Sequence, residues 1–219
     1  MTIHKIFHFF LIISIIIIIL VCTTCMLESD IATFRKESGF PYKITFTHSK
    51  SNSQSHSIGF ENGGAGQFTV AQRWTPSQLA SEGVAGGLLT EVEFMGNIRS
   101  AVYTIRIWTD GSEYQKYFYP GILRVEKIIP VNTISEQNWY KVKLDNPIII
   151  PTDQELWIGY HVSFSSGYPA STDQGPEFEG YGNLVNPGNN WITMKEWGGL
   201  NNLNYNWMIK GTAEIQNTD

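Results

Sequence analysis

The sequence predicts an all-β fold, an antiparallel β-sandwich or jelly roll with one short helix near residues 76–82. The first observation is a period of two, in which apolar and polar residues alternate over short segments such as 41–47. The second is the supply of turn-forming residues between these segments, among 20 glycines and 9 prolines. The third is that no amphipathic helices separate the segments, whereas a parallel sheet needs them for its crossovers.

Local signals place the individual elements. Thr75 can cap a helix whose first turn contains Pro76 and which ends at Gly83. Residues 155–160 form a dense apolar run, typical of a central strand that is buried on both faces. Two prolines bracket residues 148–150, and because proline cannot donate to a β-ladder, this piece is expected at an edge or at the start of a strand. The predicted strands cover residues 41–47, 68–74, 88–95, 101–108, 123–129, 139–150, 155–164, 191–197 and 205–215.

Two connecting segments carry their own signals. Serine occupies every second position from Ser49 to Ser57, and the low hydrophobicity of this stretch favours a flexible linker. The pair Asp110-Gly111 between apolar runs is a hairpin signal, with a long loop up to Tyr119.

Length and charge limit the possible functions. The 219 residues suit one β-sandwich domain, residues 41–217, behind a tether of residues 26–40 and an N-terminal targeting segment of residues 1–25. The net charge is −5, and no cluster of Lys and Arg is available to displace counterions from phosphates. We therefore expect no nucleic-acid partner.

The N-terminus has the pattern of a membrane-targeting segment. Lys5 precedes an apolar stretch over residues 9–22 that is interrupted by Ser14, an arrangement typical of an export signal. The apolar run over residues 6–22 is near the lower limit for crossing a bilayer, so an uncleaved membrane anchor is the alternative.

Both cysteines, Cys22 and Cys25, lie at the end of this run, so the domain itself can form no internal disulfide. Their position resembles a bacterial lipoprotein signal, which implies acylation of Cys22 or Cys25. The following Glu28-Ser29-Asp30 resembles the surface-export tag of some Bacteroidetes lipoproteins. We expect an exported protein of the bacterial cell envelope, held at the outer membrane or the cell surface.

A series of motifs over residues 58–215 resembles a β-sandwich module of secreted and surface proteins of Bacteroidetes, including adhesin-like and peptidase-associated proteins. The resemblance implies a sandwich fold and a binding role with an undefined ligand. The motifs that carry it, in order, are AQRWTPSQLA (71–80), YTIRIWTDG (103–111), IPTDQELWIGY (150–160), YPA (168–170), DQGP (173–176) and LNYNW (203–207).

Signals for catalysis are missing from the sequence. No G-x-S-x-G, H-E-x-x-H or cysteine-nucleophile pattern occurs, so we expect a protein that is not an enzyme and needs no cofactor. Three acidic residues, Asp173, Glu177 and Glu179, leave two alternatives open. They could bind Ca²⁺, which takes oxygen ligands, or form the carboxylate pair of a hydrolase. The interpretation that we favour is a solvated acidic loop.

The segment from residue 167 to residue 197 is the candidate ligand-binding region. Aromatic rings stack on flat faces and amide side chains form directional hydrogen bonds, which suits recognition of a sugar or a peptide. The alternative is that these rings close the open end of the sandwich. We expect a surface-displayed, adhesin-type module that binds an extracellular glycan or protein; the alternative is a structural or assembly component of the envelope. The candidate ligand-binding residues are Tyr168, Phe178, Tyr181, Trp191 and Trp197.

Overall fold

A computed structural model describes residues 41–188 and 190–216, of which Lys43–Ile215 form one compact unit. The predictions for the targeting segment, for Cys22 and Cys25 and for the tether concern residues 1–40 and lie outside the described residues. In the described ranges, no helix has the length and apolar content that crossing a membrane requires.

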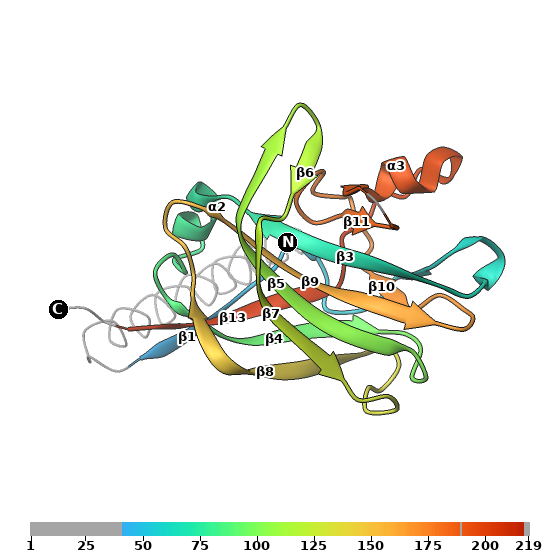
Figure 1. The fold of residues 1–219 in the computed structure, drawn as a ribbon, viewed down its shortest axis with the longest axis horizontal. Coiled ribbons are helices and arrows are strands. Elements are labelled where there is room, and N and C mark those ends of the chain that lie inside the picture. The colour runs from blue at the N-terminus through green and yellow to red at the C-terminus, as the bar shows by residue number, and fades with distance from the viewer. Residues whose placement is uncertain (1–40, 189, 217–219) are drawn as a thin grey trace, which may run out of the picture. The chain divides into compact units, whose positions relative to one another are not determined.

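Thirteen strands and two short α-helices make up the described chain. Figure 1 shows them in colour order from blue to red. The strands are β1 (Tyr42–Phe46), β2 (His56–Ile58), β3 (Gly66–Trp74), β4 (Leu88–Gly96), β5 (Val102–Tyr114), β6 (Tyr117–Tyr119), β7 (Ile122–Ile129), β8 (Asn138–Ile149), β9 (Glu155–Phe164), β10 (Ala170–Thr172), β11 (Leu184–Asn186), β12 (Ile192–Thr193) and β13 (Ile209–Ile215); the α-helices are α2 (Pro76–Ser81) and α3 (Met194–Gly198), and the 3-10 turns are η1 (Glu61–Gly63) and η2 (Gly199–Asn201).

The strands form two sheets. The first has the order β1-β13-β4-β10-β2, and β8 also pairs with β4. The second has the order β12-β11-β3-β9-β5-β6, and β7 also pairs with β5. Strand β9 lies between β3 and β5 and pairs antiparallel with both over most of its length, as a central strand should. The central position predicted for residues 155–160 is therefore confirmed.

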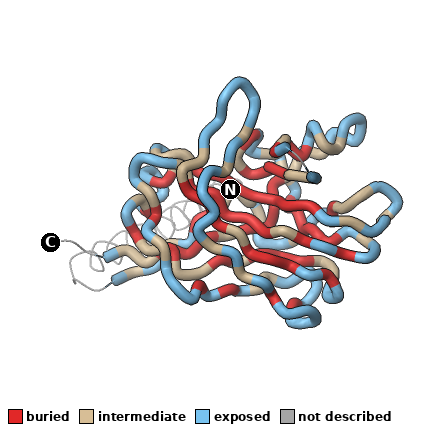
Figure 2. Tube along the Cα trace, in the orientation of Figure 1, coloured by how far each residue is buried: buried red, intermediate tan, exposed pale blue. Residues whose placement is uncertain are grey.

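The core lies between the two sheets. Side chains of alternate positions on β4, β5 and β9 meet there, and Figure 2 shows the resulting bands of buried chain. The ring of Phe94 on β4 lies 5.0 Å from Tyr160 on β9 and 5.2 Å from Tyr103 on β5, measured between centroids. Burial of these apolar side chains is the main stabilising contribution. The all-β antiparallel sandwich predicted from the sequence is confirmed.

Both α-helices begin at a capping box. The predicted helix is α2, where Thr75 and Gln78 form a capping box with Pro76 in the first turn. The strand predicted over residues 191–197 is correct only for β12, because α3 follows it at once. A second capping box, between Thr193 and Glu196, supplies the hydrogen bonds that start α3.

Two other connections differ from the prediction. The serine-rich segment is held against the domain and is no linker: Trp139 Nε1–H donates to Asn52 O, and Ser55 N–H donates to Thr172 O. Strand β5 continues through Asp110-Gly111, and the hairpin turn falls instead at Gln115 and Lys116, whose φ values are 48° and 73°. Figure 1 shows this β5–β6 hairpin extending beyond the rest of its sheet.

Candidate functional site

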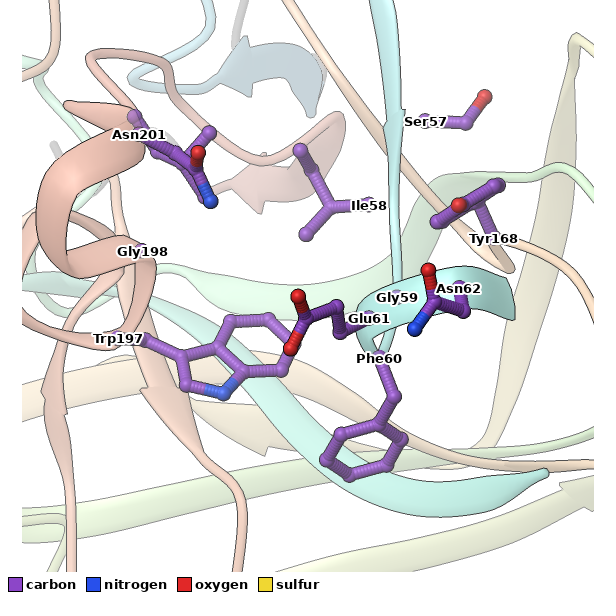
Figure 3. A pocket seen from close by; sticks show the side chains of 11 residues that line it. Ser57, Ile58, Gly59, Phe60, Glu61, Asn62, Tyr168, Trp197, Gly198 and Asn201 are labelled. Atoms are coloured by element: carbon purple, nitrogen blue, oxygen red, sulfur yellow. The ribbon is translucent and has the colours of Figure 1, made fainter. Parts of the chain in front are cut away.

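A groove opens at the end of the sandwich where the η1 turn faces α3 and η2 (Figure 3). Its volume is about 550 Å³. Three separate parts of the chain build it, namely residues 57–62, Tyr168 and residues 197–203. The lining residues are Ser57, Ile58, Gly59, Phe60, Glu61, Asn62, Tyr168, Trp197, Gly198, Asn201 and Leu203.

Aromatic rings form one wall of the groove. Trp197 lies on α3, so the capping box at Thr193 also fixes the position of the indole. Its ring contacts Phe60 edge-on, with 5.9 Å between centroids, and lies 5.1 Å from Phe68 in the core. Trp197 is thus supported from behind while one part of it lines the groove. Such a ring offers a rigid, flat surface to a ligand.

The loop that carries Tyr168 depends on two glycines for its backbone conformation and packing. Gly167 has φ +93°, a conformation that other residues rarely adopt. A Cβ on Gly59 would lie only 2.8 Å from Gly167 O, so the two backbone segments can approach closely only with glycine there. Tyr168 is 44% exposed, and its carbonyl oxygen accepts a hydrogen bond from Asn97 Nδ2. The tyrosine ring is therefore presented to solvent on a fixed backbone.

Polar side chains complete the groove. Glu61 and Asn62 lie on η1, and Asn201 ends η2, so a carboxylate and two amides line the same space as the rings (Figure 3). Carboxylate and amide groups can accept and donate several directional hydrogen bonds to hydroxyl groups. The arrangement can hold a neutral polar ligand by stacking and hydrogen bonding.

Phe178 and Tyr181 lie elsewhere, in a packed cluster around His48. Their rings are stacked on each other at 4.9 Å, and Phe178 is 42% exposed. His48 stacks on Trp74 at 4.6 Å and meets Phe178 edge-on at 5.0 Å. Its Nε2 hydrogen-bonds to Arg73 O (2.8 Å), and burial lowers the pKa of His48 to about 4. The imidazole is therefore neutral at pH 7 and serves as part of the packing.

Arg73 joins this cluster to the hairpin. Its side chain is 2% exposed, and Cζ of its guanidinium lies 4.6 Å from the Tyr181 ring centre and 5.1 Å from that of Phe118. Nη2 donates to Glu113 on β5 at 2.5 Å, and Nη1 lies 3.5 Å from Glu155. The buried cation thus ties the 178–181 loop to the base of the β5–β6 hairpin.

Trp191 belongs to a second small core on the outer face of the β3-β9-β5 sheet. It is 9% exposed, and its ring meets Trp157 at 5.3 Å and Trp108 at 5.7 Å, both edge-on. Its backbone also forms a bridge with Phe118. Of the five predicted ligand-binding residues, the groove brings together Tyr168 and Trp197; Phe178, Tyr181 and Trp191 lie in the two packed clusters.

The acidic residues do not form one solvated loop. Asp173 is fully buried, and its two oxygens accept four hydrogen bonds of 2.7–2.9 Å from Lys50 N–H, Gly175 N–H, Asn206 N–H and Asn206 Nδ2. The interpretation as a solvated loop is therefore wrong for Asp173. Its carboxylate is buried because it accepts hydrogen bonds from N–H groups of the surrounding loops that would otherwise lack a partner.

Glu177 and Glu179 differ from Asp173. Glu177 accepts a hydrogen bond from Asn183 Nδ2, and partial burial raises the pKa of its carboxyl. Glu179 is exposed. Among residues 41–188 and 190–216, no group of three or more His, Cys, Asp or Glu side chains is arranged to hold a metal ion.

The groove residues that sequence reasoning missed include the ring of Phe60 and the polar side chains of Glu61, Asn62 and Asn201. The run Phe60–Gly64 contains a usable signal, since an aromatic, an acid and an amide precede two glycines. No pattern in the sequence places this run opposite Trp197, because the two are separated by more than half of the chain.

No protein-family model matches the chain, and no curated protein does. Two solved structures of infectious bursal disease virus, from the Gt and Gx strains, show a distant likeness at 13% identity. Their TM-scores are 0.27 and 0.24, over 82% and 80% of this chain. The chain spans 37% and 36% of those two chains. A likeness this weak carries no argument about function.

Proposed function

We propose that this protein is a non-catalytic binding module that recognises an extracellular glycan in the groove between η1, Tyr168 and α3. The observation that carries the proposal is the combination, in one space of about 550 Å³, of exposed aromatic surface with a carboxylate and two amides. The volume falls within the roughly 300–1,000 Å³ of small-ligand sites.

The chemistry of a sugar matches this combination. A pyranose ring has an apolar face that stacks on an aromatic ring, and hydroxyl groups at its rim that need hydrogen-bond partners. Trp197 and Tyr168 offer the first kind of contact, and Glu61, Asn62 and Asn201 offer the second. A rigid sandwich that presents short loops is also a common scaffold for recognition.

The proposal includes display at a bacterial surface. The N-terminal segment has the sequence pattern of an export signal, and acylation of Cys22 or Cys25, or an uncleaved anchor, would hold the domain at the envelope. The resemblance to Bacteroidetes surface modules supports the same role. Mass spectrometry of the mature N-terminus tests it, since an acylated cysteine and an intact Met1 differ in mass.

A glycan array tests the binding role. The full chain in detergent micelles is expected to retain one class of glycan, and Tyr168→Ala and Trp197→Ala are each expected to weaken retention about tenfold or more. Tyr117→Ala is the matched control, because Tyr117 is 57% exposed on β6 and lies outside the groove. Retention of no glycan, or equal retention by the groove variants, would contradict the proposal.

One observation favours a second candidate, an assembly role through protein contact. The β5–β6 hairpin carries three exposed tyrosines, Tyr114, Tyr117 and Tyr119, and Arg73 and Phe118 anchor its base. Exposed tyrosines on an ordered hairpin suit a protein interface. A stoichiometric envelope partner that is lost from Tyr117→Ser/Tyr119→Ser but kept by Tyr168→Ala would favour this role.

A further inference from the structure

The outer face of the second sheet holds a smaller cavity of about 200 Å³, apart from the groove. Arg106 on β5 and His161 on β9 line it together with Thr69 on β3 and Asn186 on β11. The register explains the grouping: His161 lies directly opposite Thr69, and Arg106 lies opposite Gly159.

The Arg106 guanidinium has further hydrogen-bond donors that a ligand can use. Its Nε–H donates to Glu126 Oε2 at 2.8 Å, and a guanidinium has four further N–H groups. The Arg106 and Glu126 side chains are 30% and 47% exposed, so their ion pair is accessible to solvent. Such pairs contribute little free energy, and an anionic ligand can compete with Glu126 for the guanidinium.

His161 supplies a second hydrogen-bond donor, and its charge depends on its protonation state. Its Nδ1 is hydrogen-bonded to Thr69 Oγ1 at 3.1 Å, which orients the ring and leaves Nε2 as the nitrogen for a ligand. The pKa of His161 is lowered by burial first and by the Arg106 charge second, while Glu126 acts in the opposite direction. An anion bound between the two side chains would favour the protonated imidazole.

We propose that this cavity is a subsite for a small oxyanion, the carboxylate, sulfate or phosphate group of a ligand, held by Arg106 and His161. Thr69 and Asn186 contribute neutral polar groups to the same cavity. Charge-assisted hydrogen bonds from a guanidinium and an imidazolium are the strongest contacts that side chains make to oxyanions. The subsite does not depend on glycan binding in the groove.

An anion beside His161 determines the sign of the pH dependence of binding. Binding of the anion raises the pKa of His161, so the complex takes up a proton on formation. Affinity is therefore expected to rise as the pH falls from 7.5 to 5.5. In His161→Gln the ring charge is absent, and this part of the pH dependence disappears.

Calorimetric titration of the full chain in detergent micelles, at pH 6, tests the subsite with four probes. Glucuronate supplies a carboxylate, glucose 6-sulfate supplies a sulfate, inorganic phosphate is a free oxyanion, and glucose is the neutral control. The expected result is binding of at least one anionic probe at a site that Arg106→Gln weakens, whereas any binding of glucose in the groove is expected to be unchanged by Arg106→Gln. A preference for the sugar acids over phosphate identifies an acidic glycan as the source of the group, and the reverse identifies a free anion.

Three variants separate this site from general charge effects. Arg106→Gln is expected to weaken binding about tenfold, and Glu126→Gln is expected to tighten it several-fold because it removes the competitor. Arg124→Gln is the matched control, since Arg124 pairs with Asp110 at 2.9 Å in a similar way but lies outside this cavity. Affinity for the anionic probes that is unchanged in both Arg106→Gln and Glu126→Gln would overturn the proposal.

Discussion

Two regions drawn from the same stretch of sequence, residues 167–197, have opposite roles in the structure. At the groove, Tyr168 and Trp197 line open space, and Trp197 contacts the core with part of its surface. In the loop between them, Tyr181 contacts Arg73, and Trp191 is enclosed by two tryptophans. Both regions contain a tyrosine and a tryptophan. The side chains that surround each ring determine whether it is packed or can contact a ligand.

The two regions also differ in how they use their polar groups. The loop of residues 173–183 uses its polar groups internally, because Asp173 accepts four donors and Asn183 bonds to Glu177 and to Gly180 N–H. The groove residues Glu61 and Asn201 are exposed, and their polar groups face the groove. We therefore expect substitutions in the loop to change stability and substitutions in the groove to change binding.

The largest effect is expected at Asp173. Asp173→Ala leaves several buried donors unsatisfied, and the free energy of unfolding should fall by about 3–5 kcal/mol. Urea denaturation followed by tryptophan fluorescence measures this. Asp153→Ala is the control, because Asp153 is exposed in a turn and should cost no more than about 0.5 kcal/mol.

The same site gives a prediction about metals. Because four N–H groups already occupy the Asp173 oxygens, EDTA and added CaCl₂ are both expected to leave the Tm of the wild-type protein unchanged. A rise in Tm with CaCl₂ that is lost in Glu177→Gln would instead support the calcium interpretation of Asp173, Glu177 and Glu179.

Trp191 should have the next largest effect. Trp191→Ala opens a cavity beside Trp108 and Trp157 and is expected to lower the free energy of unfolding by about 3 kcal/mol. Trp191→Phe keeps a ring in place and should recover more than half of this. Glycan retention by the folded variant is expected to be unchanged. A loss of retention without a loss of folding would indicate that Trp191 contributes to glycan binding.

A smaller effect is expected from His48 as a function of pH. The folded pKa of about 4 lies below the ordinary value of 6.5, so the unfolded chain binds the proton first. The stability that the neutral ring contributes is complete above pH 6.5 and is lost as the pH falls toward 4, by about 1–3 kcal/mol. His48→Phe keeps the stacking on Trp74 without titrating, so the stability difference between wild type and variant should shrink across this window. A difference that is constant between pH 7 and pH 4 would contradict the assignment.

The sequence predicts the scaffold well because its signals are local. The alternation of strand residues and the Thr75–Gln78 capping box act within a few positions, and β9 and α2 form where they were expected. Helix α3 was missed although Thr193 and Glu196 have capping-box spacing, because the apolar residues around them favour a strand.

The site depends on contacts between distant segments, and this limits its prediction. Trp197 and Tyr168 could be identified as candidates, but Phe60 and Glu61 meet them only after both sheets have formed. Burial of Asp173 likewise depends on Lys50 and Asn206, which lie 123 and 33 positions away. Neither arrangement has a signature in a single stretch of sequence.

The assignment of recognition to the groove, and of a structural role to the loop of residues 173–183, can be tested with two variants. Its most direct test measures glycan retention and unfolding midpoint together in Tyr168→Ala and Tyr181→Ala. We predict that Tyr168→Ala loses retention at least tenfold with a midpoint close to that of the wild type, while Tyr181→Ala lowers the midpoint and retains glycan when folded. The reverse pattern, with retention lost in Tyr181→Ala and kept in Tyr168→Ala, would move recognition from the groove to the loop.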